Sequence, residues 1–147
     1  MRAKTTLTWL TAALLAVPAL ALAAPLTAAA RQQTQMAVAH AGMALGAGTL
    51  KLAHEHLHHV LNCLEGPKGK GFDAAFFDPC QGMGQGAIPD AAGDPAAQAG
   101  LQAAARLAER GLSTHTLAAA HADAKTLMDD LQRIANPPMP SPPAAAH

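Results

Sequence analysis

Residues 28–64 read AAARQQTQMAVAHAGMALGAGTLKLAHEHLHHVLNCL, and this stretch decides the fold. No proline interrupts it, and alanine, leucine, glutamine and methionine, which are all good helix formers, dominate its composition. The stretch predicts one long helix, although Gly42, Gly46 and Gly48 each weaken it by up to about 1 kcal/mol. The same glycines would permit close approach of a partner helix.

Turning this predicted helix by about 100° per residue places a mixed set of side chains on one stripe. Its steps alternate four and three, apart from one neighbouring pair, which is typical of the buried seam of a bundled helix. The members are Met36, His40, Met43, Ala47, Leu50, His54, Leu57, His58 and Leu61. The predicted seam therefore carries both histidines and methionines.

The histidine run at residues 54–59 is the best functional clue, because imidazole is the commonest metal-binding side chain. His54 and His58 share the predicted seam four residues apart, a spacing that lets both rings reach one ion. His56 and His59 are expected to point the other way, toward solvent. The sequence thus predicts His54 and His58 as a pair of metal ligands.

A second helical region begins at Asp94-Pro95, with the aspartate as the cap and proline at the first helical position. Helices are expected over 94–110 and 113–135, with a break at Gly111; a single bent helix is the alternative. One stripe of the last segment is expected to be buried. It consists of Leu117, Ala120, Ala124, Leu127, Leu131 and Ile134.

Residues 65–93 form a connector rich in glycine and proline between these helical regions. Connectors of this length are uncommon in a compact domain and are often functional. The helical domain is expected to span residues 24–136. The proline-rich tail that follows, residues 137–147, is expected to be extended or disordered.

Cys63 and Cys80 are the only cysteines. In an oxidising compartment an even pair in a small domain is most simply a disulfide. The alternative is that both thiolates join histidines on zinc or copper, with His59 one helical turn before Cys63.

The first 23 residues have the pattern of a signal peptide. A short basic start precedes the apolar run 7–22, and Ala21-Leu22-Ala23 offers a small-x-small cleavage site. The protein is therefore expected in the periplasm or secreted, with no stable membrane anchor after cleavage. An uncleaved membrane anchor is the alternative.

Charge and motifs narrow the classes of function. Ten basic and ten acidic residues give a formal net charge of zero, without the clustered positive charge that nucleic-acid binding needs. No nucleophilic serine motif, zinc-protease box or haem-attachment motif is present, and carboxylates are scarce on the predicted seams. The protein is expected not to be an enzyme.

Folding the two helical regions back on each other would bring Met36, His40 and Met43 near His121. Thioethers with imidazole suit copper, especially Cu(I), whereas the pair His54 and His58 would suit zinc or Cu(II). A methionine in a seam is, however, usually packing material. A metal-free structural or chaperone-like protein is therefore an alternative.

Together these features predict an all-α fold, either a long helical hairpin or a small up-down bundle, whose connector is closed by a disulfide. The expected function is copper or zinc binding outside the cytoplasm. A b-type haem electron carrier with Met36 and His121 as axial ligands is a further alternative. Because a hairpin buries only one face of each helix, a homodimer is also expected.

Overall fold

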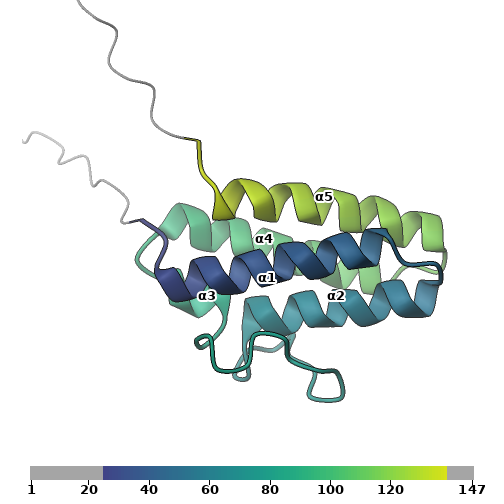
Figure 1. Cartoon of the computed structure of the whole chain (residues 1–147), viewed down its shortest axis with the longest axis horizontal. Helices are drawn as coiled ribbons and strands as arrows, with labels where there is room; N and C mark the ends of the chain where they lie inside the picture. Colours follow the sequence, from purple (N-terminus) through teal and green to yellow (C-terminus); the bar gives the residue numbers. More distant parts are fainter. Residues whose placement is uncertain (1–24, 139–147) are drawn as a thin grey trace, which may run out of the picture.

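The computed structural model describes residues 25–138 (Figure 1). The predicted signal peptide, residues 1–23, lies outside this range, and so does the predicted tail apart from Pro137 and Pro138. No helix within the described range has the length and hydrophobicity needed to cross a lipid bilayer.

Four long helices and one short helix form an up-down-up-down bundle (Figure 1). The helices are α1 (Ala28–Leu45), α2 (Leu50–Glu65), α3 (Ala87–Asp90), α4 (Pro95–Leu112) and α5 (Leu117–Ala135). Helix α1 packs against α2 and α5, and α4 packs against the same two helices. Residues 25–138 contain no strand. The expected all-α up-down bundle is confirmed.

The prediction of a single helix over residues 28–64 is wrong, because the chain reverses direction between α1 and α2. The Gly46 amide closes α1 on the Gly42 carbonyl at 3.0 Å, and the Thr49 side chain then caps α2 by accepting from the Leu52 amide at 3.2 Å. These two local signals end one helix and begin the next within four residues. Helices α1 and α2 consequently lie side by side and antiparallel (Figure 1).

The second half of the chain follows its sequence signals more closely. Asp94 caps α4 by accepting from the Ala97 amide at 3.0 Å, and Pro95 occupies the first helical position, as expected. The helix breaks after Leu112, so two separate helices are confirmed. Gly111 lies inside α4 and not at the break. Its missing side chain leaves room for Leu57, whose Cδ1 would lie 2.8 Å from an added Cβ.

The core combines leucines with many alanines. The predicted buried stripe of α5 is confirmed at its centre, where Ala120, Ala124, Leu127 and Leu131 are fully buried. On α1 the buried face differs from the predicted one. It consists of Ala30, Gln33, Thr34, Ala37, Ala41 and Ala44.

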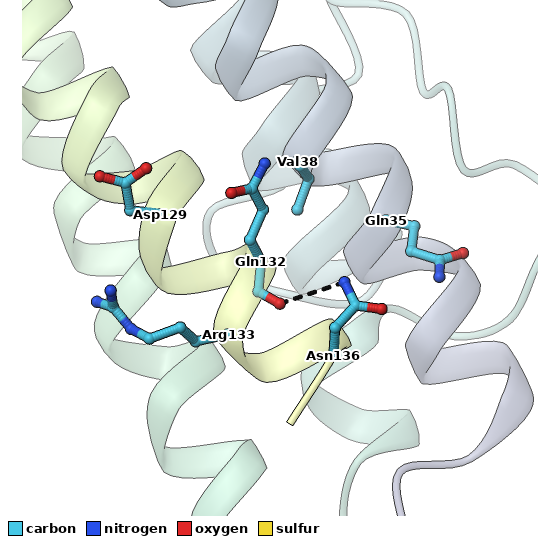
Figure 2. A pocket seen from close by; sticks show the side chains of 6 residues that line it. All are labelled: Gln35, Val38, Asp129, Gln132, Arg133 and Asn136. Atoms are coloured by element: carbon cyan, nitrogen blue, oxygen red, sulfur yellow. Dashed lines mark hydrogen bonds between the residues drawn. The ribbon is translucent and has the colours of Figure 1, made fainter. Parts of the chain in front are cut away.

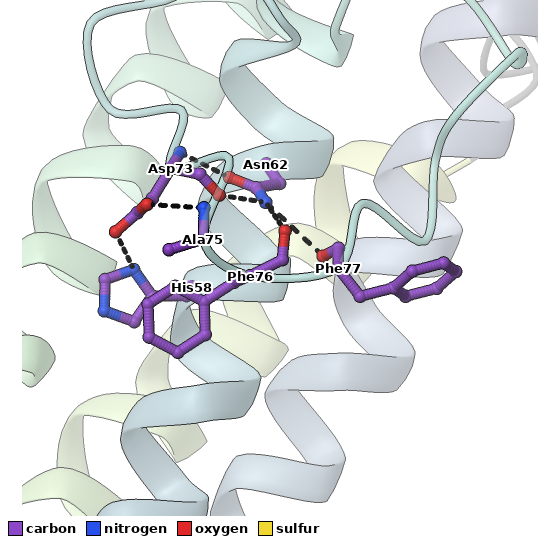
Figure 3. Close-up of polar contacts among 6 residues, drawn as sticks. All are labelled: His58, Asn62, Asp73, Ala75, Phe76 and Phe77. Atoms are coloured by element: carbon purple, nitrogen blue, oxygen red, sulfur yellow. Dashed lines mark hydrogen bonds and ion pairs between the residues drawn. The ribbon is translucent and has the colours of Figure 1, made fainter.

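A disulfide and a set of hydrogen bonds hold the connector against α2. The disulfide between Cys63 and Cys80 is present, as predicted. Beside it the buried Asn62 amide donates to the carbonyls of Asp73, Phe76 and Phe77 at 3.1, 3.2 and 3.3 Å, and its oxygen accepts from the Asp73 amide at 2.9 Å. The connector is thus held as an ordered segment along one side of α2 (Figure 3).

One chain completes the bundle by itself, since each long helix packs on two others. The expectation of a homodimer assumed a hairpin that leaves a face of each helix bare, and that premise does not hold. A homodimer therefore remains a prediction, but this packing argument no longer supports it.

Candidate metal centre

Three histidines from two helices meet at the α1–α2 interface. His40 extends from α1, and His56 and His59 extend from successive turns of α2. The Nδ1 atom of His40 lies 3.4 Å from Nδ1 of His56 and 3.3 Å from Nδ1 of His59. One ring nitrogen from each residue lies within 4.8 Å of the other two, so the three residues form a convergent donor set.

The turn between the helices creates this cluster. Because α1 and α2 run antiparallel, a residue five positions before the end of α1 comes level with the second and third turns of α2. His56 and His59 are three residues apart and therefore project from the same side of α2. His59 is only 8% exposed, whereas His40 and His56 are partly exposed.

The spacing of the nitrogens matches a single small cation. Zinc binds imidazole nitrogen at about 2.0–2.1 Å, and tetrahedral angles then separate neighbouring nitrogens by about 3.4 Å. The two closest Nδ1 separations, 3.3 and 3.4 Å, have this value. The three rings could therefore hold one transition-metal ion with little movement.

Hydrogen bonds alone do not give each ring nitrogen of the cluster a well-directed partner. A neutral imidazole has one N–H donor and one nitrogen lone pair, so a single ring nitrogen makes one well-directed hydrogen bond. The His40 Nδ1 atom faces two other Nδ1 atoms at once. A cation between the rings would accept a lone pair from all three.

The electrostatics keep the rings in the form that binds metals. Burial, followed by repulsion from charge on His59 and His56, lowers the pKa of His40 to about 4. Burial also lowers the pKa of His59, although Glu55 partly opposes the shift. A metal competes with protons for the imidazole nitrogen. A ring that is already neutral at pH 7 binds a metal without first losing a proton.

The predicted ligand pair His54 and His58 lies outside the three-histidine cluster. Leu57 and Leu61 of the predicted seam are buried, but the buried face continues to Ala53 and Val60, which leaves His54 and His58 partly exposed at its edge. His54 Nε2 is 3.5 Å from the Thr114 hydroxyl of the α4–α5 turn. Among residues 25–138, the pair forms no convergent group with a third histidine, cysteine or carboxylate.

His58 has contacts with the connector instead. Its ring stacks on Phe76 with centroids 3.8 Å apart, and its Nδ1 atom lies 3.8 Å from an Asp73 carboxylate oxygen (Figure 3). Burial lowers the pKa of His58, and the negative charge of Asp73 opposes this shift in part. Figure 3 shows the Phe77 ring pointing away from this stacked pair, and its centroid lies 6.2 Å from that of His59.

The predicted site of Met36, His40, Met43 and His121 is not assembled. His121 Nε2 binds the Ala47 carbonyl at 2.9 Å, beyond the end of α1, whereas Met36 lies nine residues before that end and packs against the core. At 1.5 Å rise per residue, these two levels are separated by about 14 Å or more. Met36 and His121 are therefore too far apart to bind opposite faces of one haem iron.

Two other features of residues 25–138 are weaker candidates for a metal site. The group Cys63, Asp78 and Cys80 also converges, but the disulfide occupies both sulfurs, so the expected alternative of thiolate ligands is wrong for this state. A shallow pocket between α1 and α5 is surrounded by polar side chains (Figure 2). Of its charged groups, Asp129 pairs with Lys125 and Arg133 pairs with Asp130.

Sequence reasoning missed His56 and His59 because it carried the phase of one helix through residues 46–49. The signal that would have found them was local: glycines followed by Thr49, a residue suited to capping a new helix. Treating α2 as a separate helix places the apolar residues Leu57, Val60 and Leu61 inside. His56 and His59 then fall together on a flank of the helix.

Comparisons with protein-family models, with curated proteins and with solved structures found no match to this chain.

Proposed function

We propose that this protein binds a transition-metal ion, copper or zinc, through His40, His56 and His59, and that it does so outside the cytoplasm. The observation that carries the proposal is the convergence of three ring nitrogens with closest separations of 3.3 and 3.4 Å. Three protein ligands leave a further position on a four-coordinate ion for another donor.

The disulfide supports a location in an oxidising compartment, because cytosolic thiols are normally kept reduced. This agrees with the signal-peptide pattern of residues 1–23. The function is proposed to be binding and not catalysis, since the sequence contains no nucleophilic serine motif and no zinc-protease box.

Metal titration of single variants tests this proposal. Replacing His40, His56 or His59 by alanine should each weaken Zn(II) or Cu(I) binding about tenfold or more, because a lost ligand in so small a set is not replaced. His54→Ala and His115→Ala are matched controls from outside the cluster and should change the affinity less than about twofold. Competition with a chromophoric chelator measures the affinity for both metals.

Two results would contradict the proposal. One is a wild-type protein that binds neither metal, which would favour a metal-free structural role. The other is an equal loss of affinity for His54→Ala and His56→Ala, which would indicate a loose histidine-rich surface and not a built site.

A further inference from the structure

Three large apolar side chains are exposed between residues 25 and 138. They are Met43, Leu52 and Phe77, with exposed fractions of 48, 40 and 69%. Each is next to a different member of the cluster. Met43 follows His40 by three residues on α1 and Leu52 precedes His56 by four on α2, while the Phe77 ring is 6.2 Å from that of His59.

Among these three side chains, only that of Met43 contains an atom able to bind a metal. Residues three apart on a helix have Cβ atoms about 5–6 Å apart, within reach of a long side chain. The Met43 side chain also leans toward the N-terminal end of α1, over the turn that carries His40. Because half of it is exposed, it can turn toward an ion without leaving a hole in the core.

Met36 is the other methionine near His40, four residues earlier on α1. It is partly buried and packs against the main core cluster. Moving its thioether to the histidines would remove that packing. The geometry therefore favours Met43 over Met36.

We infer that the Met43 thioether is the fourth ligand of the site and that it makes the site prefer Cu(I) over Zn(II). The inference rests on the proposed function. A thioether is a soft donor that suits Cu(I) and adds little for Zn(II). The ion binds as Cu(I), the thioether adds one copper–sulfur bond to the three copper–nitrogen bonds, and no electron is transferred. Leu52 and Phe77 then shield the ion from water beside the bound thioether.

The Met43→Leu variant tests the inference, because leucine keeps the apolar surface and removes the sulfur. Cu(I) affinity should fall about tenfold or more, while Zn(II) affinity changes less than about twofold. Met36→Leu is the matched control and should change neither. X-ray absorption at the copper edge should show one sulfur neighbour in the wild type and in Met36→Leu, and none in Met43→Leu.

Unchanged Cu(I) affinity and a retained sulfur neighbour in Met43→Leu would overturn the inference and leave the histidine site in place. Equal losses for both metals would also overturn it, since they would indicate an effect on packing. If the wild type bound neither metal, the proposed function itself would fail, so the two failures are distinguishable.

Discussion

His40 is the residue on which the candidate site depends, because its Nδ1 atom faces both other rings. It is the only ligand from α1, so it joins the two helices of the site. Burial and its two histidine neighbours lower its pKa to about 4. Its neutral ring is what the folded state favours at neutral pH.

The metal-free protein should therefore lose stability as the pH falls below about 6.5. The unfolded chain binds a proton at His40 with the ordinary pKa of about 6.5, while the folded chain resists it down to about 4. The folded state is thus penalised between these values. Allowing for partial exposure, we expect a loss of about 1 kcal/mol between pH 7 and pH 5.

Urea unfolding of chelator-treated protein at the two pH values measures this loss. Between pH 7 and pH 5, the free energy of unfolding of His40→Gln should fall by about 1 kcal/mol less than that of the wild type. The exposed control His115→Gln should show the same fall as the wild type. Equal pH dependence in wild type and His40→Gln would show that His40 is not responsible.

At this scale the sequence predicted that histidines form the candidate site, but not which histidines converge. Imidazole was identified from composition, and His40 belongs to both the predicted and the observed set. His54 and His58 were chosen because their spacing fits one ion in a regular helix. Spacing within a helix gives relative direction only, and the absolute direction depends on which face packs.

At the scale of the elements, the Asn62 amide helps to order the connector. It is 1% exposed and makes hydrogen bonds with three connector residues, Asp73, Phe76 and Phe77. These bonds hold Phe76 on His58 and bring Phe77 toward His59. The connector is therefore part of the surroundings of the candidate site.

Asn62→Ala should destabilise the protein by about 2–3 kcal/mol, because it removes four hydrogen bonds made by a side chain that is 1% exposed. Asn136→Ala is the matched control, since that exposed side chain donates only to the Gln132 carbonyl, and it should cost less than about 0.5 kcal/mol. Denaturant unfolding gives both values, and hydrogen exchange should speed up at residues 73–77 in Asn62→Ala alone. Protection of those amides at the wild-type level would contradict this role.

Helix ends marked by strong local chemistry were predictable. Asp94-Pro95 was identified because capping and proline geometry act within one turn. The turn after α1 was missed because its glycines are also compatible with a weakened helix. Only the packing of α2 against α1 decides between the two outcomes.

For the whole molecule, the abundance of alanine explains which part of the fold could be predicted. Alanine favours helix everywhere, so the all-α class follows from composition. It does not distinguish faces, because alanines lie on both the buried and the exposed sides of α1, α4 and α5. The buried face of α1 uses Ala37, Ala41 and Ala44, whereas the larger Met43 is 48% exposed.

An alanine core leaves little space for larger side chains. Ala108 on α4 is fully buried, and Ala103 on the same helix is exposed. Ala108→Leu should destabilise the protein by about 1–3 kcal/mol through overpacking, whereas Ala103→Leu should change stability by less than about 0.5 kcal/mol. Thermal unfolding compares them, and equal stability would show that the core is not closely packed.

Nitrogen NMR of histidine-labelled protein titrated with Zn(II) tests the central claim most directly. We expect the Nδ1 signals of His40, His56 and His59 to shift together and to stop changing at one equivalent, because these atoms converge on one point. The signals of His54 and His58 should stay in place. Shifts at His54 and His58 in the same titration range, or no saturation at one equivalent, would contradict the site.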